Sequence, residues 1–197
     1  YESIVKQLLP EEQIFAMVSG TKWDMKDLPS SFSTYVTTLL DVMSIVAGKV
    51  NSVAPEHIQK FIWEKLVAHV MRCLIEAFSR VKKCSHNGRA QMSMDISTLS
   101  RGIDQVSAGS SSCKEAKALQ SFIKAYYNDN EKDFLKWLGE DEDALNGLAM
   151  HHILSLVKLE KSPISKLSRK KKAELVRSCE SAWKQFVSGR LREVDQD

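Results

Sequence analysis

A cysteine, a serine and a histidine stand side by side in the run RVKKCSHNGRAQMSMD at residues 80–95. A thiol or hydroxyl beside an imidazole could act as a nucleophile with its general base. The nearby cations Lys82, Lys83 and Arg89 would lower the pKa of the Cys84 thiol. However, adjacent residues rarely reach the geometry of a catalytic pair, and no glycine-rich elbow accompanies these. The run therefore favours a turn that ends a helix, with an ordinary thiol, over an enzyme active site.

The remaining histidines predict no metal site. His57 and His69 are twelve residues apart, and the adjacent His151 and His152 should point to different faces of a helix. Neither HxxxH nor HExxH occurs, the four cysteines contain no CxxC pair, and the glycine-rich phosphate-binding patterns are absent. We therefore expect no catalytic residue, no metal and no cofactor. The widely spaced cysteines fit a reducing compartment.

Positive charge gathers toward the C-terminal end of the sequence. Between Lys161 and Arg192 there are ten Lys or Arg residues, and the only acids are Glu174 and Glu180. Four consecutive cations open a helix, where the helix dipole disfavours them, so an anionic partner would stabilise this arrangement. The residues expected to contact an anionic protein or lipid are Arg169, Lys170, Lys171, Lys172 and Arg177. A solvated helix face is the alternative, and nucleic acid is not expected because no aromatic platform accompanies the charge.

The apolar periodicity predicts an all-α protein. The clearest helix starts at Pro55 and continues with apolar residues three and four apart until about 84–88. Further helices are expected as two short pieces within 3–18 and over 32–53, 89–106, 114–127, 131–138, 143–159 and 168–192. Only 8 glycines and 4 prolines interrupt the 197 residues, and no stretch has the alternation of a hairpin. No apolar run approaches the roughly 18 residues that span a bilayer.

Three segments together resemble a known family. They are VKKCSHNGRAQMSMD (81–95), SFIKAYY (121–127) and FLKWL (134–138). In the C-terminal domain family of syndetin, a long helix runs into K-K/R-C-x-x-x-G-R-A-x-M-x-x-D, followed by F/Y-I-K-A-Y-Y and a tryptophan-bearing helix. The matching positions here are Lys82, Lys83, Cys84, Gly88, Arg89, Ala90, Met92, Asp95, Ile123 to Tyr127 and Trp137. The resemblance covers about 53–157, with a looser match at 168–179. The first fifty residues match the family only as helix. The tail beyond Cys179 is longer than in the family pattern.

The resemblance implies a multi-helix bundle like the C-terminal modules of rod-like tethering subunits. Residues 54–197 would form this domain, and residues 1–53 a helical segment packed on it or leading into it. It implies a non-enzymatic module of a vesicle-tethering complex in endosomal recycling or retrograde traffic. The implied partners are other tethering-complex subunits and SNARE or small GTPase proteins, in the cytoplasm and peripherally on recycling-endosome or trans-Golgi membranes. The alternative is a membrane-surface helical module that binds phosphoinositide or other anionic lipid through its basic C-terminal tail.

We interpret residues 84–88 as a structural corner between two helices. Gly88 would cap the long helix with a positive φ, because glycine adopts that conformation without steric cost. Arg89 and Asp95 are six residues apart, too far for a pair within one turn, so each should contact a group outside its own helix. The predicted partner-binding residues are Lys82, Lys83, Arg89, Asp95, Lys124, Tyr126 and Tyr127. Since the chain begins at Tyr1 without an initiator methionine, we expect it to be part of a longer protein.

Overall fold

The computed structural model describes residues 2–28, 30–106, 113–141 and 146–194. Within these ranges the regular structure is helical, and the one β-type contact is an isolated bridge between Lys83 and Glu160. The all-α prediction and the multi-helix bundle are therefore confirmed.

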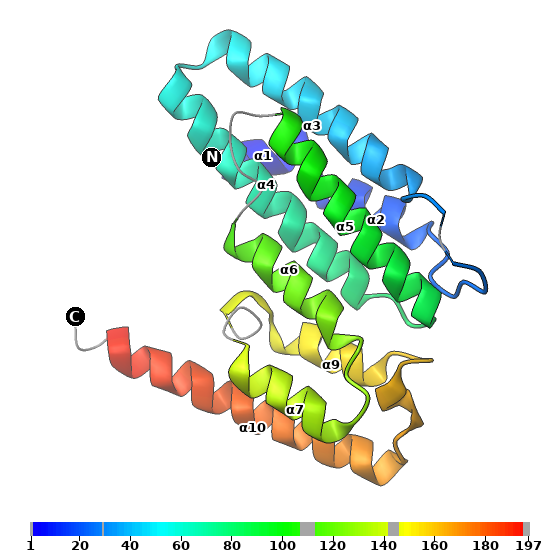
Figure 1. Ribbon diagram of the computed structural model, residues 1–197. Helices are drawn as coiled ribbons and strands as arrows, with labels where there is room; N and C mark the ends of the chain where they lie inside the picture. The colour runs from blue at the N-terminus through cyan, green and yellow to red at the C-terminus, as the bar shows by residue number, and fades with distance from the viewer. Residues whose placement is uncertain (1, 29, 107–112, 142–145, 195–197) are drawn as a thin grey trace.

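The first and larger part of the bundle is built around one central helix (Figure 1). Its helices are α1 (Glu2–Leu8), α2 (Glu11–Ser19), α3 (Thr34–Val53), α4 (Glu56–Ser79), α5 (His86–Val106) and α6 (Lys114–Ala125). The helices α1, α2, α3 and α6 all pack against α4, and α5 packs against α3 and α6. Since one hydrophobic core runs through all of them, α1 to α3 share their core with the helices that follow. A division of the chain at residue 53 stays a prediction.

A smaller second part lies below the first in Figure 1. It contains α7 (Glu131–Glu140), α9 (Met150–Lys158), the 3-10 helix η1 (Pro163–Lys166) and α10 (Arg169–Val194). The long α10 packs across α7 and α9, and Leu175 and Cys179 bury its inner face. Because α9 also packs on α4, it joins the two parts.

The corner after α4 differs from its prediction. The helix ends at Ser79, before the expected 84–88, because the following residues pair with a distant strand-like segment. The Glu160 amide donates to the Lys82 carbonyl at 2.9 Å, and the Cys84 amide donates to the Glu160 carbonyl at 3.2 Å. Gly88 lies in the first turn of α5, and no glycine in the described ranges has a positive φ. The predicted positive-φ cap is therefore wrong, and Gly88 is instead a point of close approach, because a Cβ there would meet the Trp23 carbonyl.

The helix predicted over 143–159 is also interrupted. Residues 142–145 lie outside the described part, and α9 begins only at Met150. The chain leaves the helical conformation at Leu148 and Ala149, and the Ala149 amide donates to Nδ1 of His152 at 3.0 Å. An imidazole in the first turn thus satisfies a backbone donor that a continuous helix would bond internally.

The helix α3 lies within the predicted range of 32–53, but it is more apolar than the sequence expectation allowed. By length and composition alone this helix could cross a membrane. The expectation that no apolar run approaches the length of a membrane span is therefore wrong. One face of α3 is buried against α2, α4 and α5, through Tyr35, Val36, Leu39, Met43 and Val46. Core helices satisfy the same test of length and composition, so the test alone assigns no membrane span.

Candidate interaction surfaces

The corner residues are tied to the loop between α2 and α3. The Ser85 hydroxyl donates to the Met25 carbonyl at 2.8 Å and accepts from the Met25 amide at 3.0 Å. The Asn87 side chain donates to the Lys26 carbonyl at 2.8 Å. Cys84 is fully buried, and this burial raises the pKa of its thiol to about 12. A thiol that stays protonated at neutral pH is a poor nucleophile, so the catalytic interpretation of Cys84 loses its main requirement.

Three of the predicted partner-binding residues lie inside the protein. Arg89, Asp95 and Tyr126 are 4%, 0% and 3% exposed, and a partner cannot reach them without rearrangement. Nη1 of Arg89 donates to the Tyr126 carbonyl at the end of α6. Oδ1 of Asp95 accepts from the Ser33 amide, just before α3, at 2.8 Å. Each side chain does contact a group outside its own helix, as expected, but that contact is internal, which corrects the prediction of a partner surface.

The other predicted residues of the corner remain on the surface. Lys82 and Lys124 are exposed, and Tyr127 is 42% exposed with the His86 ring at its edge, 6.0 Å between centroids. Lys83 forms an ion pair with Asp24 at 3.2 Å. Their role in partner binding stays a prediction.

Two lysines from distant segments share the carboxylate of Asp24. The Lys161 ammonium lies 2.6 Å from Oδ1, and the Lys83 ammonium lies 3.2 Å from Oδ2. The hydrogen bond from Lys161, with that from Lys83, holds the pKa of Asp24 below its usual value. Through Asp24, this ion pair network connects the corner to the segment before η1. Lys83 already has an internal acidic partner.

The start of α10 presents the basic surface that the sequence predicted. Arg169, Lys170, Lys171 and Arg177 are exposed, and Lys172 is half-buried. No acidic residue stands in the first turn, and no ion pair joins these five cations to an acidic group within the described ranges. Because the helix dipole is also positive at this end, an anionic group would gain from both sources. We call Arg169, Lys170, Lys171, Lys172 and Arg177 the α10 basic surface.

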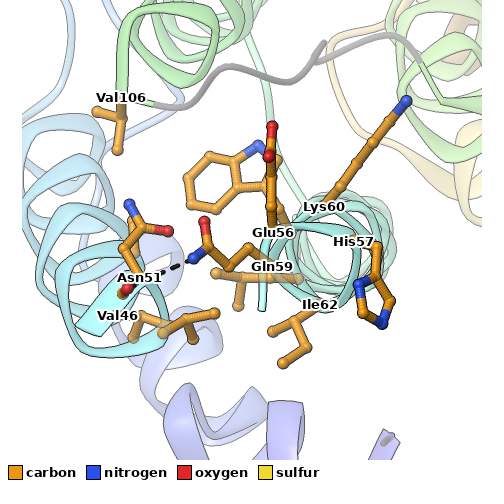
Figure 2. A pocket seen from close by; sticks show the side chains of 12 residues that line it. Val46, Asn51, Glu56, His57, Gln59, Lys60, Ile62 and Val106 are labelled. Carbon is orange, nitrogen blue, oxygen red and sulfur yellow. Dashed lines mark hydrogen bonds between the residues drawn. The ribbon is translucent and has the colours of Figure 1, made fainter. Parts of the chain in front are cut away.

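A partly apolar groove lies at the end of α4 that is opposite the corner (Figure 2). It has a volume of about 570 Å³ and lies between the end of α3, the start of α4 and Val106. The side chain of Gln59 fixes its edge by donating to the Ala54 carbonyl at 2.7 Å. The indole N–H of Trp63 borders the groove, is buried, and has no hydrogen-bond acceptor in the described part of the chain. The groove thus combines an apolar floor with polar side chains such as Asn51 and Lys60 and with the buried indole donor of Trp63.

The adjacent His151 and His152 meet on one carboxylate, against the expectation that they point apart. Oε2 of Glu76, on α4, lies 2.8 Å from Nε2 of His151 and 3.0 Å from Nε2 of His152. Oε1 of the same carboxylate accepts from Nε of Arg80 at 2.9 Å. Both histidines stand in the first turn of α9, and α9 packs against α4, which carries Glu76. This cluster joins the second part of the bundle to the central helix.

Acidification should weaken this junction. Burial by itself raises the pKa of Glu76, but hydrogen bonds from His151, His152 and Arg80 outweigh it and lower the pKa to about 2. Burial lowers the pKa of His152. Both folded-state values lie below the unfolded ones, so the unfolded chain binds more protons and the stabilisation is lost as the pH falls. For His152 the loss begins below about 6.5, and for Glu76 it extends from about 4.5 to about 2.

The measurement is urea unfolding of the wild type and of Glu76→Gln across this range of pH. The destabilisation caused by Glu76→Gln should be complete at pH 7 and should shrink toward zero as the pH approaches 2. A difference that stays constant over the whole range would show that the carboxylate charge contributes nothing to the junction.

Two groups of side chains have the composition of metal ligands. One is Glu76, His151 and His152, and the other is Glu11, His69 and Cys73. The sequence interpretation predicted neither. The spacing HxxxC at residues 69–73 would have indicated two ligands on one helix face, whereas the acidic ligand comes from a different helix.

The segments that suggested a family lie against one another in the folded chain. The Arg89 contact to Tyr126 joins the first segment to the second. The indole N–H of Trp137, in the third, donates to the Ser121 hydroxyl in the second at 2.9 Å, and that hydroxyl donates to Oδ2 of Asp141 at 2.6 Å. These residues are therefore a hydrogen-bonded framework that positions α5, α6 and α7.

A helical bundle with an internal polar framework, an exposed basic helix start and an apolar groove has the features of a protein-interaction module. The sequence model of the family described as Syndetin, C-terminal, matches residues 1–180. The chain belongs to this family. The match begins at residue 1, so the first fifty residues, expected to resemble the family only as helix, are part of it.

Individual relatives support the same assignment. Syndetin of Gallus gallus is 27% identical over 162 residues, which covers 80% of this chain and 16% of the relative. Syndetins of Rattus norvegicus and Mus musculus are each 26% identical over 148 residues, covering 73% of this chain and 15% of the relative. The chain thus spans about a sixth of the length of these curated relatives.

Proposed function

We propose that this chain is a non-enzymatic module of a vesicle-tethering complex that acts in endosomal recycling or retrograde traffic. The observation that carries the proposal is the family match over residues 1–180, supported by relatives that are named syndetin. The all-helical fold and the buried Cys84 thiol fit a role in binding rather than in catalysis. The module would work in the cytoplasm, peripherally on recycling-endosome or trans-Golgi membranes.

The partners would be other subunits of the tethering complex, with SNARE or small GTPase proteins as further candidates. Docking of one helix into an apolar groove is one recurring way to recognise such partners, and surrounding charges set the orientation. The α10 basic surface and the exposed Lys82, Lys124 and Tyr127 are the surfaces on which we expect these contacts. Arg89, Asp95 and Tyr126 would contribute only by holding the corner in shape.

Reversing charge on the α10 basic surface should remove its anionic partner. We expect the change of Arg169, Lys170 and Lys171 to Glu to lower the recovery of tethering subunits on the immobilised chain at least roughly tenfold. Each basic residue near an anionic surface contributes about 1 kcal/mol, and about 1.4 kcal/mol corresponds to a factor of ten. The measurement is quantitative recovery of subunits from cell extract, at two salt concentrations.

The control carries the same change of net charge at Lys22, Lys26 and Lys49, which are exposed on other elements. It should recover subunits like the wild type. Equal recovery by all three proteins would place the contact elsewhere. Binding to vesicles of anionic lipid, without any recovered subunit, would argue for the membrane-surface alternative instead.

A further inference from the structure

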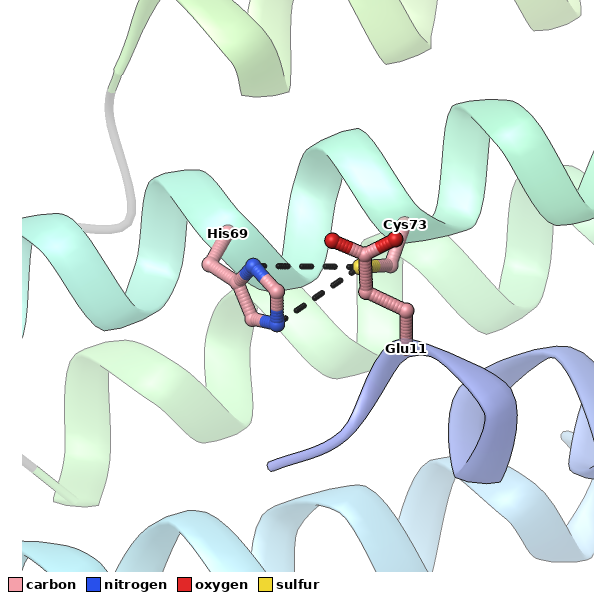
Figure 3. A group of neighbouring side chains, drawn as sticks. All are labelled: Glu11, His69 and Cys73. Carbon is pink, nitrogen blue, oxygen red and sulfur yellow. Dashed lines mark hydrogen bonds between the residues drawn. The ribbon is translucent and has the colours of Figure 1, made fainter. Parts of the chain in front are cut away.

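Side chains from two helices converge on a small space beside α4. Figure 3 shows Glu11, the first residue of α2, pointing from below toward His69 and Cys73, which are one turn apart on α4. Ligand atoms from all three lie within 4.8 Å of one another. Sγ of Cys73 is 3.7 Å from Nε2 and 3.9 Å from Nδ1 of His69. The three residues form what we call the Cys73 cluster.

We propose that the Cys73 cluster binds one zinc-like divalent cation. A thiolate, an imidazole nitrogen and a carboxylate oxygen are the three kinds of ligand that Zn²⁺ uses in proteins. With Zn–S near 2.3 Å and Zn–N near 2.1 Å, a tetrahedral centre places the sulfur and the nitrogen about 3.6 Å apart. Sγ of Cys73 lies 3.9 Å from Nδ1 of His69, close to that value, so a small rotation of the Cys73 side chain completes the geometry.

His69 is already oriented as a ligand. Its Nε2 lies 2.9 Å from the Leu9 carbonyl, and since a carbonyl can only accept, Nε2 carries the proton of the neutral ring. Nδ1 is then left with a lone pair. A histidine that binds a metal usually donates its other N–H to a carbonyl or carboxylate in this way, which fixes the ring and its tautomer. The ring is 3% exposed, so few alternative orientations are open to it.

The surroundings leave room for a metal and a further ligand. The cluster borders a pocket of about 410 Å³, which would admit a water molecule as fourth ligand. The carboxylate of Glu11 is held by the ammonium of Lys6 at 3.4 Å, on the exposed side, and this weak ion pair would be exchanged for the metal. Burial raises the pKa of the Cys73 thiol to about 12, so the metal must displace the thiol proton as it binds.

The second group on the same pocket is a poorer metal site. Nδ1 of His152 accepts from the Ala149 amide, so the neutral ring carries its proton on Nε2, which donates to Glu76. That nitrogen has no lone pair to offer while α9 keeps its first turn. Of the two groups, only the Cys73 cluster contains a sulfur and a histidine in the tautomer that a metal requires. A cation there would fasten α2 to α4 at the start of the chain.

The test is a titration of the reduced chain with Co²⁺, a spectroscopic substitute for Zn²⁺. Binding at the Cys73 cluster should give a thiolate-to-cobalt charge-transfer band and the visible absorption of a tetrahedral site, saturating at one equivalent. Added Zn²⁺ should abolish both. Cys73→Ser should remove the charge-transfer band, and Glu11→Gln and His69→Gln should each weaken Co²⁺ binding tenfold or more.

The controls test Cys113, a free thiol that is not buried, and the exposed histidine His151. Cys113→Ser should keep the band, because the serine hydroxyl can cap α6 as the Cys113 sulfur does. His151→Ala, at an exposed position, should keep it as well. The proposal is overturned if the reduced wild type gives no charge-transfer band, or if the band survives in Cys73→Ser. Since Glu11 is half-exposed and its change should leave the fold intact, unaltered affinity in Glu11→Gln would also overturn it.

Discussion

Replacing Gly88 by alanine will lower the free energy of unfolding by at least about 3 kcal/mol. A Cβ atom on residue 88 would lie 1.8 Å from the Trp23 carbonyl oxygen and 2.8 Å from its carbon. It would also approach Sγ of Cys84 at 3.2 Å. The nearest obstacle is backbone, and the same Trp23 carbonyl accepts from the Ser85 amide at 3.1 Å. The clash can be relieved only by moving the loop between α2 and α3 away from the start of α5.

The measurement is equilibrium unfolding in urea, followed by circular dichroism. Two other helical glycines are matched controls, because a Cβ at Gly48 or Gly139 would meet no atom within 4 Å. Gly48→Ala and Gly139→Ala should raise the free energy of unfolding by about 0.5–1 kcal/mol each, since alanine is the better helix former. If Gly88→Ala behaved like these two, the close approach of the loop to α5 would not exist in solution.

Replacing Asp95 by alanine should cost about 3 kcal/mol of stability. The buried carboxylate accepts two hydrogen bonds at Oδ1, from the Ser33 amide and from Nε2 of Gln91, both at 2.8 Å. Nε2 of Gln91 also donates to the Ser31 carbonyl at 3.0 Å. Loss of Asp95 therefore leaves the Ser33 amide without its acceptor and loosens the residues that lead into α3. Hydrogen bonds to charged groups contribute roughly 1.5–3 kcal/mol each, and some of this is recovered because the buried charge disappears.

The comparison with Asp95→Asn separates the hydrogen bonds from the charge. The asparagine oxygen can accept from the same two donors, so we expect this variant to lose only about 1 kcal/mol. Hydrogen exchange of the Ser33 amide gives a local readout, and protection should fall in Asp95→Ala but not in Asp95→Asn. Equal protection of Ser33 in both variants would contradict the assigned role of Asp95.

The helices could be predicted from the sequence because the buried face of each helix appears as apolar residues spaced three and four apart. Residues three and four apart share a helix face wherever the helix is placed, so the stripe beginning at Ile58 identifies α4 without knowledge of its neighbours. Pro55 and Glu56 mark its beginning for equally local reasons. The end of α4 could not be found in the same way, because it depends on the pairing of Lys82 and Cys84 with Glu160, far along the chain.

The sequence could not show that Arg89 and Asp95, two of the predicted partner-binding residues, are buried. In the sequence, Arg89 and Asp95 resemble any exposed charged pair, since a charged side chain is rarely buried without a partner. Their partners are the Tyr126 carbonyl and the Ser33 amide, and backbone groups give no signal in the residue types. The motif therefore pointed to the right family, while the role of its charged members could not be read from it.

The sequence by itself determined the helical class, the family, and the basic start of α10, because periodicity, motif and local charge are properties of neighbouring residues. Only the tertiary structure decided which polar groups meet. It placed His151 and His152 on Glu76, and Glu11 beside His69 and Cys73, where the sequence predicted no site. The physical reason is that hydrogen bonds and metal ligation act over a few ångströms in space. The helices that bring such groups together are placed by packing of the apolar core, whatever their separation along the chain.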